Sequence, residues 1–375
     1  MMKKVVFITG TRADFGKLKS LIIRLQQHEK FDVHIFVTGM HMMKKYGDTK
    51  TEVRRLNINN TFYFINQNEF DSMDVVLSKT IGGFSDYVKN INPDLVVVHG
   101  DRVETLAGTI VSSLNNIRVA HIEGGEVSGT IDEVIRHAVS KMANLHFVCN
   151  QEAKRRLMQL GEREDSIFVI GSPDIDIMTS SALPSIYEVK EHYGINFDKY
   201  AIFMYHPVTT EIELVRENIR ECVASLIESG DNFIVIYPNN DHGTNYIIDA
   251  IDELRGEPRF KVYPSIAFER FLVLIKNAQY IIGNSSAGVR EAPFYGVPTV
   301  NIGSRQNNRS TSNTICNVRE CRSEILKAIE SVKRKVYSPV AEFGCGDSCE
   351  LFAAALDTEE FWLDKRQKQF IDILK

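Results

Sequence analysis

Three carboxylates, Asp101, Glu123 and Asp132, are the residues best suited to chemistry in this 375-residue chain. The first two directly follow short apolar runs that are typical of buried strands, and Asp132 opens a helical pattern nine residues after Glu123. Crowded carboxylates raise one another's pKa values, so that one can accept a proton and another can donate one near neutral pH. The spacing therefore predicts proton transfer at a carbon atom. Metal ligation is the competing use, but no D-x-D pair accompanies these residues, and no metal is expected.

Each of these carboxylates also has a structural interpretation. An ion pair with Arg102 would account for Asp101, because a charge at the end of a buried strand is costly unless it is paired. Asp132 would be the negative residue that a helix N-terminus favours, or the partner of Arg136 four residues later. Both interpretations remain open from these residues alone.

The turn after the first predicted strand reads Gly10-Thr11-Arg12-Ala13-Asp14-Phe15-Gly16. Two glycines six residues apart do not form the G-x-G-x-x-G fingerprint of dinucleotide-binding folds, so this turn gives no reason to expect a nicotinamide or flavin cofactor. A tight turn that contains Arg12 and opens a helix still suits a phosphate or a carboxylate. The alternative is an ordinary strand–helix turn with Asp14 as the helix cap.

A small polar stretch in the second half of the chain, residues 283–291, suits a diphosphate. It follows a predicted strand and opens a predicted helix, so free backbone N–H groups and the hydroxyls of Ser285 and Ser286 would meet an anion there. Glu291, placed within that helix, would accept hydrogen bonds from ribose hydroxyls. Plain helix capping by the serines and a solvent-exposed Glu291 are the structural alternative.

Short β-branched runs that alternate with amphipathic helical patterns predict the elements that position these residues. The runs are apolar on both faces, as parallel strands covered by helices require, and the alternation predicts a doubly wound α/β fold. Strands are expected at residues 5–9, 33–37, 95–98, 119–122, 146–148 and 168–170, and then at 201–205, 233–237, 261–263, 280–282 and 299–302.

The pattern pauses after the sixth strand, which predicts two domains. Residues 1–172 would form an N-terminal domain with the carboxylates, and residues 173–355 a C-terminal domain with the diphosphate-binding stretch. A last helix near 361–374, within residues 356–375, would pack back on the N-terminal domain. The carboxyl ends of both sheets would then face one ligand in a cleft between the domains.

The composition excludes several classes of protein. Hydrophobic residues make up 43% and charged residues 25% of the chain, which is ordinary for a globular protein. The net charge of −5 gives no general attraction to nucleic acid or to an anionic membrane, and no apolar stretch is long enough to span a bilayer. Six cysteines without a C-x-x-C pair predict reduced thiols in a cytoplasmic protein.

Several spaced motifs resemble the hydrolysing UDP-N-acetylglucosamine 2-epimerases. The similarity runs from Gly10 to Gln306, and its most specific parts are Thr38-Gly39-Met40-His41, His99-Gly100-Asp101-Arg102, His121-Ile122-Glu123-Gly124-Gly125-Glu126 and residues 283–291. Non-hydrolysing relatives typically read Gly-Thr-Arg-Pro-Glu, Gln-Gly-Asp-Thr and His-Arg-Arg-Glu-Asn at three places. This chain has Gly-Thr-Arg-Ala-Asp, His-Gly-Asp-Arg and His206-Pro207-Val208-Thr209 there, so it is more similar to the hydrolysing branch.

The resemblance implies a GT-B fold, meaning two Rossmann-like domains with parallel sheets around an active-site cleft. It also implies a UDP-sugar substrate, UDP as a product, no cofactor, and a homodimer or homotetramer. Asp101, Glu123 and Asp132 match the family's catalytic carboxylates, with His41, His99 and His121 as supporting residues at the substrate. The positions that match the family's diphosphate site are Arg12, Arg102, His206, Asn239, Ser285 and Ser286, and His206 would also assist the departure of the diphosphate. Glu291 matches the position that binds the ribose, and Ile266 and Phe271 match those that pack against the uracil.

The implied reaction is elimination of UDP followed by hydration of a glycal intermediate, which gives N-acetylmannosamine. Two alternatives keep the epimerase chemistry: the same hydrolysing reaction on UDP-N,N′-diacetylbacillosamine, and non-hydrolysing epimerisation of UDP-N-acetylglucosamine. Two others change the class of protein: a GT-B glycosyltransferase and a non-catalytic nucleotide-sugar sensor. A glycosyltransferase needs one base and a sensor needs none, so three clustered carboxylates favour an epimerase.

Overall fold

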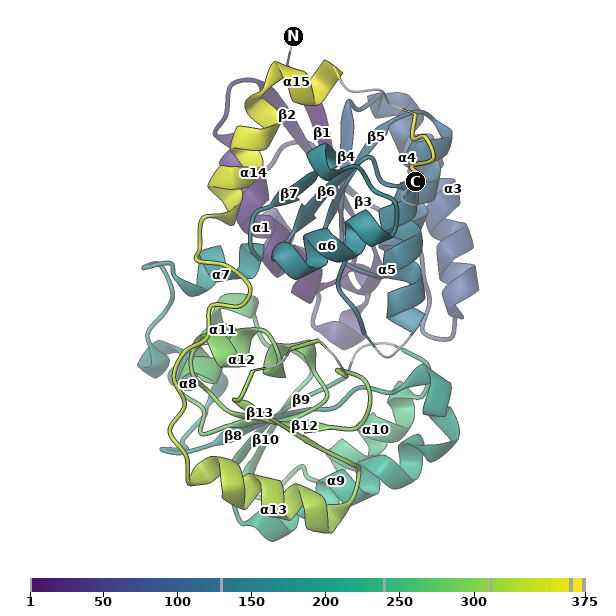
Figure 1. Cartoon of the computed structure of the whole chain (residues 1–375). Coiled ribbons are helices and arrows are strands. Elements are labelled where there is room, and N and C mark those ends of the chain that lie inside the picture. Colours follow the sequence, from purple (N-terminus) through teal and green to yellow (C-terminus); the bar gives the residue numbers. More distant parts are fainter. Residues whose placement is uncertain are drawn as a thin grey trace. The chain divides into compact units, whose positions relative to one another are not determined.

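The computed structural model describes residues 2–128, 131–238, 241–307, 309–310, 312–363 and 367–372. The chain folds into two compact units (Figure 1). The first unit comprises Met1–Glu126, Asp132–Thr179 and Phe343–Lys375, and the second comprises Val127–Ile131 and Ser180–Glu342. The first unit is therefore built from both ends of the chain.

The first unit is built on a parallel sheet with the strand order β3-β2-β1-β4-β5-β6-β7. Successive strands are added outward from β1 in one direction and then, from β4 onward, in the other. The order therefore reverses between β1 and β4, which lie side by side with Val5 opposite Leu95. The strands are β1 (Lys3–Thr9), β2 (Phe31–Val37), β3 (Thr61–Tyr63), β4 (Leu95–His99), β5 (Arg118–Ile122), β6 (Leu145–Val148) and β7 (Ile167–Val169).

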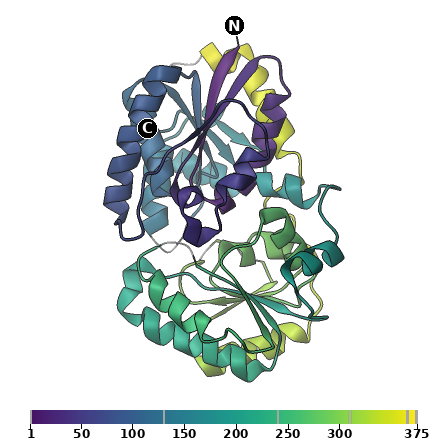
Figure 2. The same ribbon diagram turned by 180° about the vertical axis from the view of Figure 1, so that it is seen from behind.

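Helices cover both faces of this sheet, as Figures 1 and 2 show from opposite sides. Along β1, Val5 and Phe7 belong to the core under α1 and α14, whereas Val6 and Ile8 belong to the core under α3, α4 and α5. This alternation explains why β1 is apolar at every central position. The helices are α1 (Arg12–Gln26), α2 (Lys50–Arg54), α3 (Met73–Ile91), α4 (Val103–Leu114), α5 (Ile131–Met142), α6 (Gln151–Gln159), α7 (Pro173–Met178), α14 (Ser348–Asp357) and α15 (Glu359–Leu363), with 3-10 turns at η1 (Gly39–Met42), η2 (Lys44–Tyr46) and η3 (Glu164–Ser166).

The second unit repeats this plan with a parallel sheet of order β10-β9-β8-β11-β12-β13, which reverses between β8 and β11. Its main core lies between the sheet and α9, α10 and α13. The strands are β8 (Ala201–Met204), β9 (Phe233–Ile236), β10 (Phe260–Tyr263), β11 (Ile281–Gly283), β12 (Thr299–Ile302) and β13 (Ile315–Val318). The helices are α8 (Ile186–Tyr193), α9 (Val215–Ser229), α10 (Thr244–Asp252), α11 (Phe268–Lys276), α12 (Glu291–Phe294) and α13 (Arg322–Lys333), with 3-10 turns at η4 (Thr209–Leu214) and η5 (Ser286–Gly288). Within the described residues of either unit, no helix combines the length and the apolar character needed to cross a membrane.

Every predicted strand is present, but two strands were missed and one helix was wrong. The missed strands, β3 and β13, are short and lie at sheet edges, where half-exposed residues give no continuous apolar run. The helix predicted near 361–374 ends at Leu363 as far as the described residues extend, because residues 367–372 are not helical. In that segment the amine of Lys368 instead donates a hydrogen bond to the buried carboxylate of Glu162.

Candidate functional site

Asp101, one of the predicted carboxylates, lies where the strand order of the first unit reverses. Loops that leave the carboxyl ends of β1 and β4 are neighbours there, and in open α/β sheets this is the place where ligands bind. The β1 loop carries Arg12, whose guanidinium lies 2.7 Å from the carboxylate of Glu52. The β4 loop carries Asp101 and Arg102. The position of these side chains follows from the topology alone.

Glu123 directly follows β5 and presents a buried carboxylate. Its backbone is left-handed, with φ of 64°, which is unusual for a residue with a side chain, and its N–H donates to the carbonyl of Phe147 at 2.9 Å. Three side chains surround the carboxylate: the Lys17 amine at 3.2 Å, the His99 imidazole at 3.2 Å and the Ser172 hydroxyl at 2.7 Å. Donors on a carboxylate favour its ionised form, so Glu123 is set up as a buried anion.

Lys17, Ser172 and Asp174 were not predicted as site residues. The Lys17 amine lies between two buried carboxylates, because it also approaches Asp174 at 3.4 Å. Lys17 is 7% exposed although it is a lysine near the start of α1. A signal for Lys17 was present in the sequence: it lies four residues before Leu21, on the apolar face of the predicted helix. A cation on a core-facing position requires an anion beneath it.

Asp101 and the helix α5 are joined by a buried arginine. Arg136, which is 1% exposed, forms an ion pair with Asp101 and donates a hydrogen bond to the backbone carbonyl of Glu126 at 3.3 Å. Asp132 lies in the first turn of the same helix and is half-buried. The structure thus gives Asp101 an ion-pair partner from α5, and places Arg102 with its Nε atom 3.7 Å from Glu104.

The histidines His41 and His121 are both fully buried and act as neutral hydrogen-bonding groups. Burial, with a contribution from the Arg12 charge, lowers the pKa of His41 to about 3, and its ring lies between the hydroxyls of Thr9 at 3.0 Å and Thr49 at 2.7 Å. Burial lowers the pKa of His121 to about 3 as well. His121 Nε2 lies 2.8 Å from the carbonyl of Gly100, which can only accept, so Nε2 carries the proton.

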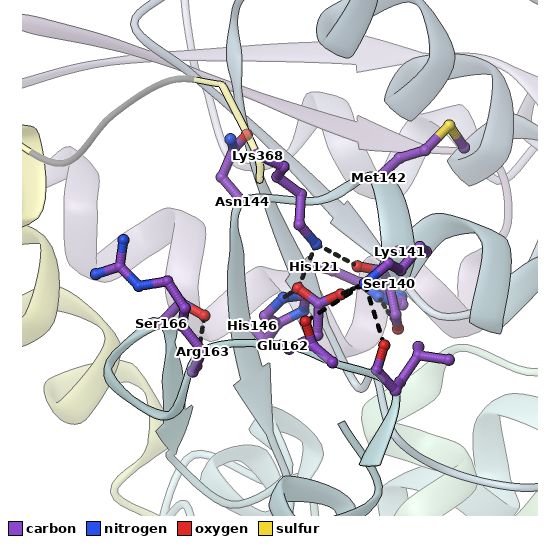
Figure 3. Close-up of polar contacts among 12 residues, drawn as sticks. His121, Ser140, Lys141, Met142, Asn144, His146, Glu162, Arg163, Ser166 and Lys368 are labelled. Atoms are coloured by element: carbon purple, nitrogen blue, oxygen red, sulfur yellow. Dashed lines mark hydrogen bonds and ion pairs between the residues drawn. The ribbon is translucent and has the colours of Figure 1, made fainter. Parts of the chain in front are cut away.

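Beside His121 lies a buried ionic network that reaches the C-terminal segment (Figure 3). His146 on β6 is paired in register with His121 on β5, and its Nε2 lies 3.0 Å from the carboxylate of Glu162. Glu162 also binds the Lys368 amine, which reaches the backbone carbonyl of Ser140 at 3.4 Å. Burial opposes the charge on Glu162, but the hydrogen bonds from His146 and Lys368 hold its pKa below the usual value. The hydroxyl of Ser140 lies 3.0 Å from His121 Nδ1, so the network ends on the histidine that supports the β4 loop.

In the second unit, one amide side chain hydrogen-bonds the loops that follow β8 and β11 to each other. Asn284, directly after β11, accepts a hydrogen bond from the His206 backbone N–H at 2.6 Å and donates one to the His206 carbonyl at 2.9 Å. Gly283 makes this close approach possible: its φ is 128°, and a Cβ there would lie 1.9 Å from the Met204 carbonyl oxygen. His206, predicted at the diphosphate, is thereby held with its side chain buried at the end of β8.

The second loop over this corner comes from the end of β12. Arg305 and Gln306 both donate to the Asn284 carbonyl, at 3.3 and 2.9 Å. The loop after β12 therefore contacts the predicted motif at residues 283–291. Asn284 was not singled out from the sequence, because a single asparagine after a strand gives no signal of which backbone it will bind.

The predicted helix after β11 is broken into two short pieces. The first piece is the 3-10 turn η5, with Ser285 as its cap accepting from the Ala287 N–H at 3.4 Å, and the second is the four-residue helix α12. Glu291 is the first residue of α12, not a residue well inside a helix, and it is 4% exposed. Pro293 has no N–H to bond the carbonyl of residue 289, so a continuous helix cannot form across this stretch.

The remaining predicted residues fall in three places. Ile266 lies two residues before α11 and Phe271 lies within it, and both are buried, 5% and 8% exposed. Ser286 opens η5. Asn239 lies outside the described residues. Within the described part of the chain, no three His, Cys, Asp or Glu side chains are grouped so that they could hold a metal ion.

Comparison with known proteins identifies the family. The family model for UDP-N-acetylglucosamine 2-epimerase matches residues 23–357. The chain is 46% identical over 376 residues to the UDP-N-acetylglucosamine 2-epimerase of Neisseria meningitidis serogroup B, covering 99% of this chain and 100% of the relative. It is 33% identical over 339 residues to the hydrolyzing UDP-N,N′-diacetylbacillosamine 2-epimerase of Legionella pneumophila, covering 89% of this chain and 90% of the relative.

A solved structure shows the same fold. The crystal structure of UDP-GlcNAc 2-epimerase from Neisseria meningitidis bound to UDP-GlcNAc superimposes with a TM-score of 0.80 at 19% identity, covering 94% of this chain and 99% of the other. Together with the two parallel Rossmann-like sheets, this confirms the predicted GT-B class. The chain belongs to the UDP-N-acetylglucosamine 2-epimerase family.

Proposed function

We propose that the chain is a hydrolysing UDP-N-acetylglucosamine 2-epimerase, which converts UDP-N-acetylglucosamine and water to N-acetylmannosamine and UDP. The observation that carries the proposal is the buried Glu123 carboxylate, which Lys17, His99 and Ser172 surround. A charged carboxylate shielded from solvent and fixed by neighbouring donors is suited to abstract a proton from carbon. The 46% identity over the whole of a named UDP-N-acetylglucosamine 2-epimerase supports the choice of substrate.

The reaction proceeds by elimination and then hydration. A carboxylate takes the proton from C2 of the sugar while the C1–O bond breaks and UDP departs, which leaves a C1=C2 glycal. Water then adds its oxygen at C1, and a proton is delivered to C2 from the opposite face. Two groups are needed because removal and delivery occur on different faces of the ring.

Glu123 and Asp132 are the proposed proton-transfer pair, and Asp101 positions the sugar. The ion pair with Arg136 supports this division, because a carboxylate neutralised by a buried guanidinium is a poor proton donor. Arg12, Arg102 and His206, with Ser285 and Ser286, would stabilise the departing diphosphate. Glu291 would bind the ribose, and Ile266 and Phe271 would pack against the uracil.

The hydrolytic outcome is supported by the motifs and by one relative. His-Gly-Asp-Arg at residues 99–102 matches the hydrolysing pattern, and the Legionella pneumophila relative, which carries "hydrolyzing" in its name, is 33% identical. That relative acts on UDP-N,N′-diacetylbacillosamine, and this nucleotide is the second candidate substrate. The higher identity to the Neisseria meningitidis protein favours UDP-N-acetylglucosamine.

The test is phosphorus and proton NMR of the purified protein with UDP-N-acetylglucosamine in deuterated water. We expect free UDP together with N-acetylmannosamine that carries deuterium at C2. UDP-N-acetylmannosamine with an intact diphosphate would instead establish the non-hydrolysing reaction. The variant Glu123→Gln should lower the turnover at least about 100-fold, as expected on loss of a general base. If the protein turned over neither this nucleotide nor the diacetylbacillosamine nucleotide, the epimerase proposal would be wrong.

A further inference from the structure

Glu104, in the first turn of α4, is a buried carboxylate for which the proposed reaction has so far given no role. The residue is 2% exposed. Among the residues that the structure describes, none donates a hydrogen bond to either of its carboxylate oxygens. The Nε atom of Arg102 lies 3.7 Å from Oε2, which is beyond hydrogen-bond length. Buried carboxylates are costly without donors, so Glu104 needs a donor beyond those that the described residues supply.

Two glycines make room for this carboxylate at the ends of β1 and β2. A Cβ on Gly10 would lie 3.0 Å from the carboxyl carbon of Glu104, and a Cβ on Gly39 would lie 2.8 Å from Oε1. Gly39 has φ of +62°, a conformation that glycine adopts without strain. The carboxylate of Glu104 thus lies against the turns that carry Arg12 and His41, at the same edge of the sheet as Asp101. Its position is at the candidate site, and neither turn can carry a larger residue without displacing it.

Because a carboxylate accepts hydrogen bonds, Glu104 can bind only those parts of the substrate that donate them. An ionised carboxylate only accepts hydrogen bonds, and the oxygens of a diphosphate at neutral pH also only accept. The two groups therefore repel each other, whereas a sugar offers hydroxyl and amide N–H donors. We propose that Glu104 is a sugar-binding residue whose buried carboxylate accepts hydrogen bonds from the hydroxyl or acetamido groups of the substrate. This inference rests on the proposed function, since it assigns a role within the same site.

The competing role for Glu104 is indirect. With Arg102 only 3.7 Å away, the carboxylate would position that guanidinium for the diphosphate without touching the sugar. The two roles differ in what they do to UDP, which has the diphosphate but no sugar beyond it. A sugar-binding Glu104 leaves the affinity for UDP unchanged, whereas a residue that positions Arg102 weakens it.

The experiment measures kcat and KM for UDP-N-acetylglucosamine, and the inhibition constant of UDP, for wild type, Glu104→Gln and Glu104→Asp. Glu104→Gln should lower kcat/KM by about 10- to 150-fold, the loss typical of a hydrogen bond to a charged group. The inhibition constant of UDP should stay within about twofold. Glu104→Asp keeps the carboxylate but shortens the side chain by one methylene, and it should show the same pattern. This variant replaces Glu104→Gln in the experiment if the glutamine variant does not fold. The surface variant Glu330→Gln, on the exposed face of α13, is the control and should match wild type.

Each outcome decides between the interpretations. A rise in the UDP inhibition constant that parallels the loss in kcat/KM would overturn sugar binding and assign Glu104 to Arg102. Unchanged kcat/KM in both Glu104 variants, with active wild type, would overturn the inference and leave the proposed function standing. Inactive wild type would refute the function and the inference together.

Discussion

Acid should destabilise the first unit through its buried histidines, and His121 allows the effect to be measured. In the folded protein burial lowers the pKa of His121 from 6.5 to about 3. The His121 imidazole therefore becomes protonated near pH 6.5 in the unfolded chain, but only near pH 3 in the folded protein. The stability that the neutral imidazole contributes is present above pH 6.5 and is lost as the pH falls toward 3.

The size of the effect follows from the two pKa values. Below pH 6.5, each such histidine lowers the free energy of unfolding by about 1.4 kcal/mol per pH unit. Between pH 7 and pH 5 the loss attributable to His121 is about 2 kcal/mol. His41, whose pKa is also lowered to about 3, adds a similar amount. Together these two residues make the first unit about 4 kcal/mol less stable at pH 5.

The chain carries its own reporter for this unit. Its one tryptophan, Trp362, lies on α15 in the first unit and donates from Nε1 to the Leu356 carbonyl at 2.8 Å. Urea denaturation followed by tryptophan fluorescence at pH 7 and pH 5 therefore measures the first unit. We expect His121→Gln to be less stable than wild type at pH 7, because it loses hydrogen bonds, and the gap to shrink by about 2 kcal/mol at pH 5.

The matched control is Ser140→Ala, which removes the hydroxyl 3.0 Å from His121 Nδ1 and leaves the imidazole in place. Its gap to wild type should be nearly the same at both pH values, because the titrating group is retained. If His121→Gln also kept a constant gap, the histidine would not be the proton-linked group, and the reasoning from burial would be refuted.

Two further substitutions test the framework around the candidate site. Gly283→Ala should prevent the second unit from folding or lower its free energy of unfolding by more than about 3 kcal/mol, because the added Cβ would overlap a backbone carbonyl. The control is Gly256→Ala, at φ of +95° with open space around it, which should cost only about 1 kcal/mol. Circular dichroism during chemical denaturation measures both variants. Lys368→Met should lower the stability of the first unit by about 2 kcal/mol, because the buried Glu162 would keep Lys141 but lose the partly buried amine of Lys368. An unchanged urea midpoint would show that the C-terminal segment contributes nothing to this network.

The sequence was sufficient to predict every described strand except β3 and β13, together with the residues that follow the predicted strands. Buried parallel strands are apolar at every position, so runs such as β4 and β5 stand out, and the residue after each run must lie at the carboxyl edge of the sheet. Asp101 and Glu123 could be placed at this edge for that reason alone. The edge strands β3 and β13 gave no such run, because their residues are partly exposed.

The partners of the predicted residues could not be predicted in the same way. Glu123 is held by Lys17 from α1 and Ser172 ahead of α7, which are 106 and 49 residues away. Such pairs are set by how helices pack on the sheet, and local periodicity does not report the packing. The ion pair of Asp101 with Arg136 is a similar case: the helix position of Arg136 was visible, but its depth of burial was not.

The two switch points of this chain are built from different chemistry, and the difference matches their proposed tasks. In the first unit, charged side chains such as Glu123 are compensated by charged partners such as Lys17. Around Asn284 in the second unit, backbone groups are satisfied by an amide and by the donors of Arg305 and Gln306. Carboxylates at the first place suit proton transfer, and Arg12 and Arg102 are the cations there that would face the diphosphate. A frame of neutral and cationic donors at the second place suits an anion, which agrees with the role proposed for it in binding the diphosphate.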